Sequence, residues 1–283
     1  MARAAFLAAG LAAASLVGRA AGTQFQSQDG QAARDAPIAA QASTAVPKQA
    51  LTVCNAYAHP QALNIYEVTS QRWLTEAQPL AYKQCSTFAL ALQEGQQLDF
   101  KVGNISVGTF RASGLPRARA SLLLVPHRRS PGSLSAAFDS HAFSELGSSQ
   151  MVIVDAYRGA EAGAVKIVDT PPEAAGGQAR AAPQPRAEEL KFSSVVVVNP
   201  GKYQVVLTDS AEKRLAALPL QVQAGDGKYI VVRTGSQPDK AKAGSLQAFP
   251  QDLILYKQEQ LSAAAATPRA ALALAVAALL ALA

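Results

Sequence analysis

Short runs in which apolar and polar residues alternate fill the middle of the chain and predict β-strands. Leu98, Phe100 and Val102 alternate with polar neighbours, and Ser86–Leu92 shows the same pattern. Alternation places every second side chain on one face of a strand, as in a sheet with one buried face. No helical periodicity of any length is present except at the two termini. The chain is therefore predicted to be all-β.

Two segments that end in an Asn/Asp-Ala-Tyr step indicate that one strand pattern occurs twice. Val53–Tyr57 aligns with Ile153–Tyr157, and further strand-like runs, a glycine turn (Gly95 and Gly201) and a Leu-Pro step follow each copy in the same order. Convergence is the alternative, since β-sandwiches share this rhythm. The shared order favours duplication. It predicts two tandem small antiparallel β-sandwich domains, immunoglobulin-like or carbohydrate-binding-module-like, with apolar helical termini.

The same patterns predict the organisation of the chain. The expected segments are a signal peptide (1–22), a flexible linker (23–50), a first β-sandwich (51–129), an inter-domain linker (130–149), a second β-sandwich (150–235), a tail linker (236–267) and an apolar C-terminal anchor or GPI signal (268–283).

The N-terminus has the layout of a secretory signal. Arg3 precedes the apolar run Ala4–Val17, and small residues follow up to Gly22. A charged start, an apolar stretch and a small-residue cleavage region are typical of such signals. The alternative is an anchor helix that is retained, although the run is shorter than the ~20 residues needed to span a bilayer.

The C-terminus carries an apolar tail, Ala270–Ala283, behind a small-residue triple that begins at Ser262. A helix of this length covers only ~21 Å, against a hydrocarbon core of ~30 Å. Small residues, a short polar spacer and an apolar tail are typical of GPI attachment, with Ser262 as the candidate site. A marginal membrane helix and a peripheral tail remain open. We expect an exported, membrane-attached protein at the cell surface, or a periplasmic one in a bacterium.

The two cysteines, Cys54 and Cys85, are predicted to form a disulfide, since an even pair in an exported chain usually pairs. A metal site or a nucleophilic cysteine is the alternative, but no Cys/His spacing accompanies the pair. Asn104 begins the one N-glycosylation sequon, Asn-Ile-Ser, directly after Gly103 in a predicted turn.

No motif for catalysis or cofactor binding is present. The sequence lacks H-E-x-x-H, G-x-S-x-G, a phosphate-binding loop and a dinucleotide-binding loop. The histidines, His59, His127 and His141, are interpreted as exposed loop residues. We therefore expect no metal, no cofactor and no enzymatic activity, with a spatially assembled hydrolase or transferase as a third possibility.

Charge and aromatic residues suggest what the chain binds. Arg117, Arg119, Arg128 and Arg129 lie in a stretch without acids and could form a ledge for an acidic polysaccharide or lipid headgroups. A solvated inter-domain loop is the alternative. The net charge of +6 is mild and does not favour nucleic acid. Trp73 and Tyr82 are candidates for stacking on sugars, although a lone tryptophan more often covers the edge of a core.

The combined pattern resembles the periplasmic accessory proteins of alginate O-acetylation (AlgF) and, more loosely, the domain of unknown function DUF4397. The resemblance rests on Val53–Tyr57, Ile153–Tyr157, the glycine turns and the late strand Gly227–Val232. It implies non-catalytic binding of a polysaccharide or of an envelope partner protein. The alternative function is a structural component of the envelope or extracellular matrix without a ligand.

Overall fold

The computed structural model describes residues 49–75, 78–117, 120–143, 147–170, 185–225, 227–238 and 246–258. These residues form an all-β protein without a helix, as the alternation predicted. The predicted signal peptide, residues 23–48 of the predicted flexible linker, Ser262 and the apolar tail lie outside them, and the last two residues of that linker begin a strand. Within the described ranges, no helix has the length and apolar character that a membrane span requires.

The N-terminal half, residues 49–143, contains eight strands. They are β1 (Gln49–Cys54), β2 (Leu63–Glu67), β3 (Arg72–Trp73), β4 (Cys85–Phe88), β5 (Gln97–Val102), β6 (Ile105–Arg111), β7 (Ala120–Arg128) and β8 (Ala136–Phe143). They form two four-stranded sheets, ordered β4-β1-β7-β8 and β3-β2-β5-β6.

The C-terminal half, residues 150–258, contains the other eight described strands. They are β9 (Gln150–Asp155), β10 (Gly163–Asp169), β11 (Ala187–Leu190), β12 (Ser194–Val197), β13 (Gly201–Asp209), β14 (Arg214–Val222), β15 (Lys228–Ser236) and β16 (Phe249–Gln258). The two sheets are ordered β12-β9-β15-β16 and β11-β10-β13-β14, so the strand order of the first half recurs position by position.

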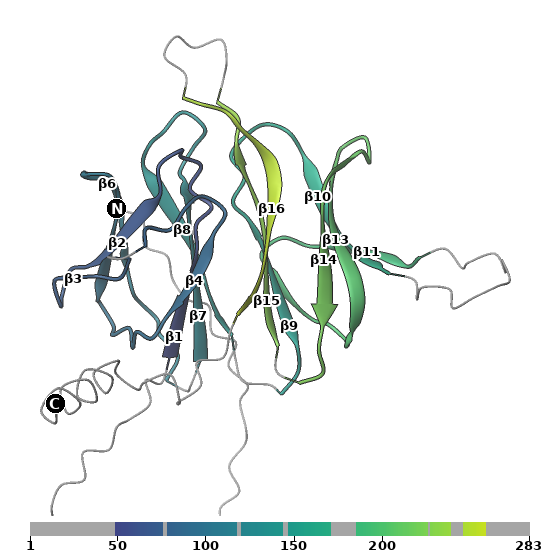
Figure 1. The fold of residues 1–283 in the computed structure, drawn as a ribbon, viewed down its shortest axis with the longest axis horizontal. Helices are drawn as coiled ribbons and strands as arrows, with labels where there is room; N and C mark the ends of the chain where they lie inside the picture. Colours follow the sequence, from purple (N-terminus) through teal and green to yellow (C-terminus); the bar gives the residue numbers. More distant parts are fainter. Residues whose placement is uncertain are drawn as a thin grey trace, which may run out of the picture.

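Three apolar clusters hold the four sheets in a stack (Figure 1). The first cluster lies between the two sheets of the N-terminal half and includes Leu63 and Phe100. The second joins the two sheets of the C-terminal half and includes Val165 and Tyr229. The third cluster joins the halves, because it contains residues of both β4-β1-β7-β8 and β12-β9-β15-β16. We call these two sheets the inner sheets and the other two the outer sheets.

The inner sheets are mixed, not antiparallel as the sequence predicted. β1 runs parallel to β7, and β9 runs parallel to β15, while the other described strand pairs are antiparallel. Alternation shows which side chains share a face, but it carries no information on the direction of a neighbouring strand.

Two strands lie where the sequence predicted connections. β8 falls within the expected inter-domain linker, and β16 falls within the expected tail. β8 has the sequence Ala-Ala-Phe-Asp-Ser-His-Ala-Phe, whose small and polar residues have low β-propensity. Both strands nevertheless complete an inner sheet, so packing overrides the local preference.

Candidate functional site

The outer face of the sheet β3-β2-β5-β6 carries a distinctive group of exposed and half-buried aromatic and polar side chains. Ile65 and Phe100, which are opposite each other on β2 and β5, point into the first core. Since side chains alternate along a strand, their neighbours Tyr66, Asp99 and Lys101 are on the other face. The strands that build the core therefore also display this polar and aromatic face.

An aromatic pair lies at the edge of this face. Trp73 of β3 is directly opposite Tyr66 of β2, and the ring centroids are 4.9 Å apart with a 58° angle between the planes. Trp73 is 37% exposed, so much of its ring faces solvent. The register continues from Tyr66 to Asp99 and from Asp99 to Thr109, which makes one row across the sheet.

A cation and an acid lie beside the two rings. The Lys101 Nζ atom is 5.3 Å from the centroid of Tyr66 and 5.3 Å from that of Trp73, within the range of cation–π attraction. The same Nζ is 3.6 Å from Asp99 Oδ2. Asp99 Oδ1 accepts hydrogen bonds from the hydroxyls of Ser106, at 2.5 Å, and Thr109, at 3.0 Å. These bonds fix the carboxylate, which in turn holds the ammonium near the rings.

We call this group the Trp73 face: Trp73, Tyr66, Lys101, Asp99, Ser106 and Thr109. Flat rings bind the apolar faces of sugars, and fixed donors and acceptors bind their hydroxyls. The ammonium of Lys101 can pair with a carboxylate or sulfate on such a sugar. The arrangement is suited to binding, because two rings, an ammonium and two hydroxyls lie together on one face of the sheet.

The other outer sheet has no equivalent of this face. The corresponding row across β11-β10-β13-β14 consists of Glu189, Lys166, Val206 and Ala217. This row contains an acid, a base and two small apolar side chains but no aromatic ring. The aromatic group is therefore a property of one half and not a requirement of the strand order that both halves share.

The four predicted arginines do not form one exposed ledge. Arg117 and Arg129 are exposed, and Arg119 lies outside the described residues. Arg128 is only 2% exposed; its Nε donates to the carbonyl of Ala58 at 2.7 Å, and its guanidinium is 5.9 Å from the Tyr57 ring centroid. Burial lowers the pKa of Arg128. Arg128 thus acts as a buried contact, which its position beside Arg129 in the sequence did not reveal.

The two aromatic residues predicted to stack on sugars lie in different surroundings. Trp73 contacts Tyr66 on the outer sheet, as described above. Tyr82 instead packs edge-on against Phe249, with centroids 5.2 Å apart, and its hydroxyl is 3.1 Å from Thr234 Oγ1. Tyr82 therefore belongs to the contact between the halves. The signal that could have found Tyr66 and Lys101 is the alternation of their strands.

The predicted disulfide is confirmed: Cys54 of β1 and Cys85 of β4 are joined, with an S–S distance of 2.03 Å. Asn104 lies in the turn between β5 and β6, where it is exposed. The predicted exposure of the histidines is wrong for His127, which is 2% exposed, and His141 is half-buried. In the part of the chain that the structure describes, no group of three or more His, Cys, Asp or Glu side chains is placed to hold a metal.

The repeated Asn/Asp-Ala-Tyr step forms the same turn twice. Asn55 Oδ1 accepts from the Tyr57 amide at 2.9 Å, and Asp155 Oδ1 accepts from the Tyr157 amide at 3.1 Å. Such turns are typical of Asn and Asp, whose side chains mimic a backbone turn. Arg158 adds support in the second copy by donating to the carbonyls of Asp155 and Tyr157, at 3.1 and 2.7 Å.

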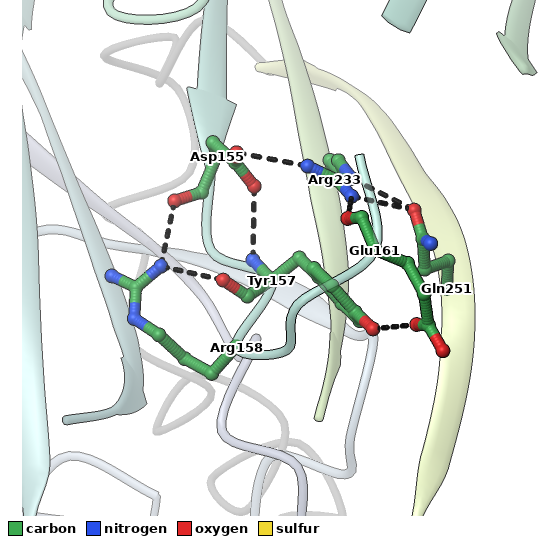
Figure 2. A network of polar contacts seen from close by, with 6 residues as sticks. All are labelled: Asp155, Tyr157, Arg158, Glu161, Arg233 and Gln251. Atoms are coloured by element: carbon green, nitrogen blue, oxygen red, sulfur yellow. Dashed lines mark hydrogen bonds and ion pairs between the residues drawn. The ribbon is translucent and has the colours of Figure 1, made fainter. Parts of the chain in front are cut away.

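Arg233 organises the second turn (Figure 2). Its guanidinium donates to Asp155 Oδ2 at 3.0 Å, to Gln251 Oε1 at 2.7 and 3.0 Å and to the carbonyl of Glu161 at 2.7 Å. It also lies 4.5 Å from the Tyr157 ring centroid, and the Tyr157 hydroxyl donates to the Glu161 carboxylate. Burial, followed by the hydrogen bond to Glu161, raises the pKa of Tyr157. Because its donors are already used, this network supports the fold and offers little to a ligand.

Comparisons with known proteins give no family for this chain. No protein-family model matches it, and no curated protein matches it.

Proposed function

We propose that this protein is an exported, surface-attached binding protein, built as two tandem β-sandwiches, that binds acidic polysaccharide without catalysis. The observation that carries the proposal is the ring pair of exposed Trp73 and half-buried Tyr66, with the Lys101 ammonium over both rings. The ring faces would contact a sugar ring, and Lys101 would pair with its acidic group. The disulfide supports an oxidising compartment, in agreement with export.

Several further features support the proposal. The same strand order in both halves supports tandem duplication of an immunoglobulin-like or carbohydrate-binding-module-like unit. The resemblance to alginate accessory proteins also implies polysaccharide binding. Asn104 is exposed, which suits a glycan in a eukaryotic secretory route. Attachment through the C-terminal tail, by a GPI anchor at Ser262 or by the tail itself, belongs to the same proposal.

The test is retention of the full chain on an immobilised polyuronate as salt is raised. Trp73→Ala removes the ring that faces solvent, and we expect about a tenfold loss of affinity. Lys101→Met removes the cation and keeps most of the stem, and we expect weaker binding with a smaller dependence on salt. Lys213→Ala is the matched control, since it removes an exposed lysine from the C-terminal half.

Each outcome decides between the candidate functions. Salt-sensitive binding that Trp73→Ala and Lys101→Met weaken, but Lys213→Ala does not, supports the proposal. Binding that depends on Arg117 and Arg129 instead moves the site to the exposed predicted arginines. No retention of the wild type on any acidic glycan favours the structural envelope component without a ligand.

A further inference from the structure

The space between the two inner sheets is closed along one side of the molecule and open along the other. A cavity of about 350 Å³ opens between β8 of the N-terminal half and β12 of the C-terminal half. Leu123, Val125, Val152 and Val154 form its floor, and all four are buried members of the third cluster. We call this space the β8–β12 cavity. It is independent of the Trp73 face, which lies on an outer sheet.

The rim of the β8–β12 cavity adds a few polar groups to this apolar floor. Asp139 and His141 contribute from β8, and Ser193 and Val195 contribute from β12 and the residue before it. Sites for small molecules combine an apolar lining with a few convergent polar groups in this way, with volumes from about 300 Å³ upward.

The recurring strand order shows what fills the same space on the other side. β16 holds the place in its sheet that β8 holds in the other, and β4 corresponds to β12. Leu123 of β7 is opposite His141 of β8. Ile230 of β15, the residue that corresponds to Leu123, is opposite Tyr256 of β16. Tyr256 is therefore the counterpart of His141.

The closed side is filled by a phenol ring and a disulfide. Tyr256 packs against the third cluster, and its hydroxyl is 3.4 Å from Thr87 Oγ1 of β4. Cys54 and Cys85 lie in the same cluster, side by side on β1 and β4.

The open side has neither a phenol ring nor a disulfide at the corresponding positions. The His141 ring packs edge-on against Phe143, with centroids 4.9 Å apart. Val154 and Ser193 occupy the places of the two cysteines. What is missing from the open side, relative to the closed side, is a ring the size of a phenol.

We infer that the β8–β12 cavity binds a small phenol, with its ring on the valine and leucine floor and its hydroxyl at the polar rim. The closed side shows that a phenol ring fits between these sheets and that its hydroxyl finds a side-chain partner there. His141 and Ser193 offer donors and acceptors at the rim. Burial lowers the pKa of His141, which favours the neutral imidazole. Asp139 also lines the cavity; its side chain is 48% exposed, its Oδ2 lies 3.2 Å from His127 Nε2, and its carboxylate disfavours an anionic substituent on the ligand.

The test uses 4-ethylphenol as the probe and follows the methyl resonances of the full chain by NMR. We expect saturable shifts at Leu123, Val152 and Val154, in the millimolar range or tighter. His141→Tyr introduces the ring that Tyr256 supplies on the closed side, and we expect about a tenfold or greater loss of binding with the melting temperature kept or raised. Tyr256→Phe is the matched control, which removes only the hydroxyl on the closed side and should leave binding unchanged.

A second comparison keeps the inference testable if His141→Tyr fails to fold. 4-Hydroxyphenylacetate carries a negative tail on the same ring, and we expect it to bind several-fold more weakly than 4-ethylphenol to the wild type. Asp139→Asn should reduce this difference. The inference is overturned if 4-ethylphenol causes no saturable shift at the floor, if His141→Tyr folds and binds as well as the wild type, or if the anion binds more tightly.

Discussion

The two Asn/Asp-Ala-Tyr turns share a hydrogen bond from the tyrosine amide to a side-chain oxygen, but the accepting side chain is neutral in one turn and charged in the other. Asn55 is fully buried and neutral, and its Nδ2 donates to the carbonyl of Leu80 at 2.8 Å. Asp155 is partly exposed and charged, and the buried Arg233 pairs with it at 3.0 Å. The turn requires only a side-chain oxygen that accepts from the tyrosine amide. The choice between amide and carboxylate is decided by whether a cation is packed beside it.

The largest effect is expected from breaking the charged turn. Arg233→Met removes the cation that serves Asp155, Gln251 and the carbonyl of Glu161, and leaves these three acceptors without their donor. We expect a loss of about 3 kcal/mol or more in the free energy of unfolding, because the charged guanidinium donates to three acceptors and a hydrogen bond to a charged group contributes about 1.5–3 kcal/mol. Urea denaturation measures it.

The matched control for this variant is Arg214→Met on the exposed strand β14. Surface substitutions usually change stability by less than about 0.5 kcal/mol. Equal losses in the two variants would show that the network of Figure 2 contributes nothing particular to the C-terminal half.

The next largest effect on stability is expected from the disulfide between Cys54 and Cys85. The C-terminal half has Val154 and Ser193 at the corresponding positions. Cys54→Val/Cys85→Ser installs the side chains that the C-terminal half uses, so packing in the third cluster is preserved. The crosslink closes a sequence separation of 31 residues, and its loss should lower the free energy of unfolding by about 3 kcal/mol. Reductant should bring the wild type to the level of the double variant and leave the variant unchanged. A variant as stable as the oxidised wild type would contradict this expectation.

The smallest effect is expected from the pH dependence that His141 gives to the stability of the fold. Burial lowers the pKa of His141, so the unfolded chain binds a proton that the folded chain does not bind just below pH 6.5. The contribution of this group is present above pH ~6.5 and is lost as pH falls through the lower pKa of the folded state. His141→Phe should therefore reduce the slope of stability against pH between about pH 7 and pH 5. His59, whose pKa burial also lowers, keeps its own contribution in this variant. An unchanged slope would contradict the prediction.

Much of the strand pattern could be predicted from the sequence, because alternation is a local signal of burial. Leu98, Phe100 and Val102 are buried as predicted, and the near-copies at Val53 and Ile153 mark equivalent strands in the two inner sheets. The pairing of Cys54 with Cys85 followed from counting cysteines in a chain that the sequence predicts to be exported.

The remaining features depend on contacts between distant segments. β8 was expected to be a connection because its small and polar residues carry no strand signal, yet Phe143 is buried between the inner sheets. Arg128 was expected on the surface, but the rings of Tyr57 and Phe249 surround it. The Trp73 face was only partly foreseen, since the position of Tyr66 and Lys101 beside Trp73 is set by strand register.

The third apolar cluster has a consequence for how the molecule comes apart. Its buried residues come from both halves, among them Leu123, Val125, Ile230 and Val232. Melting either half alone would expose the facing side of the other to water, so calorimetry should record one cooperative transition for the described region. A fragment of residues 49–143 would expose the apolar residues of the third cluster to solvent. It would need polar substitutions at these residues to remain soluble.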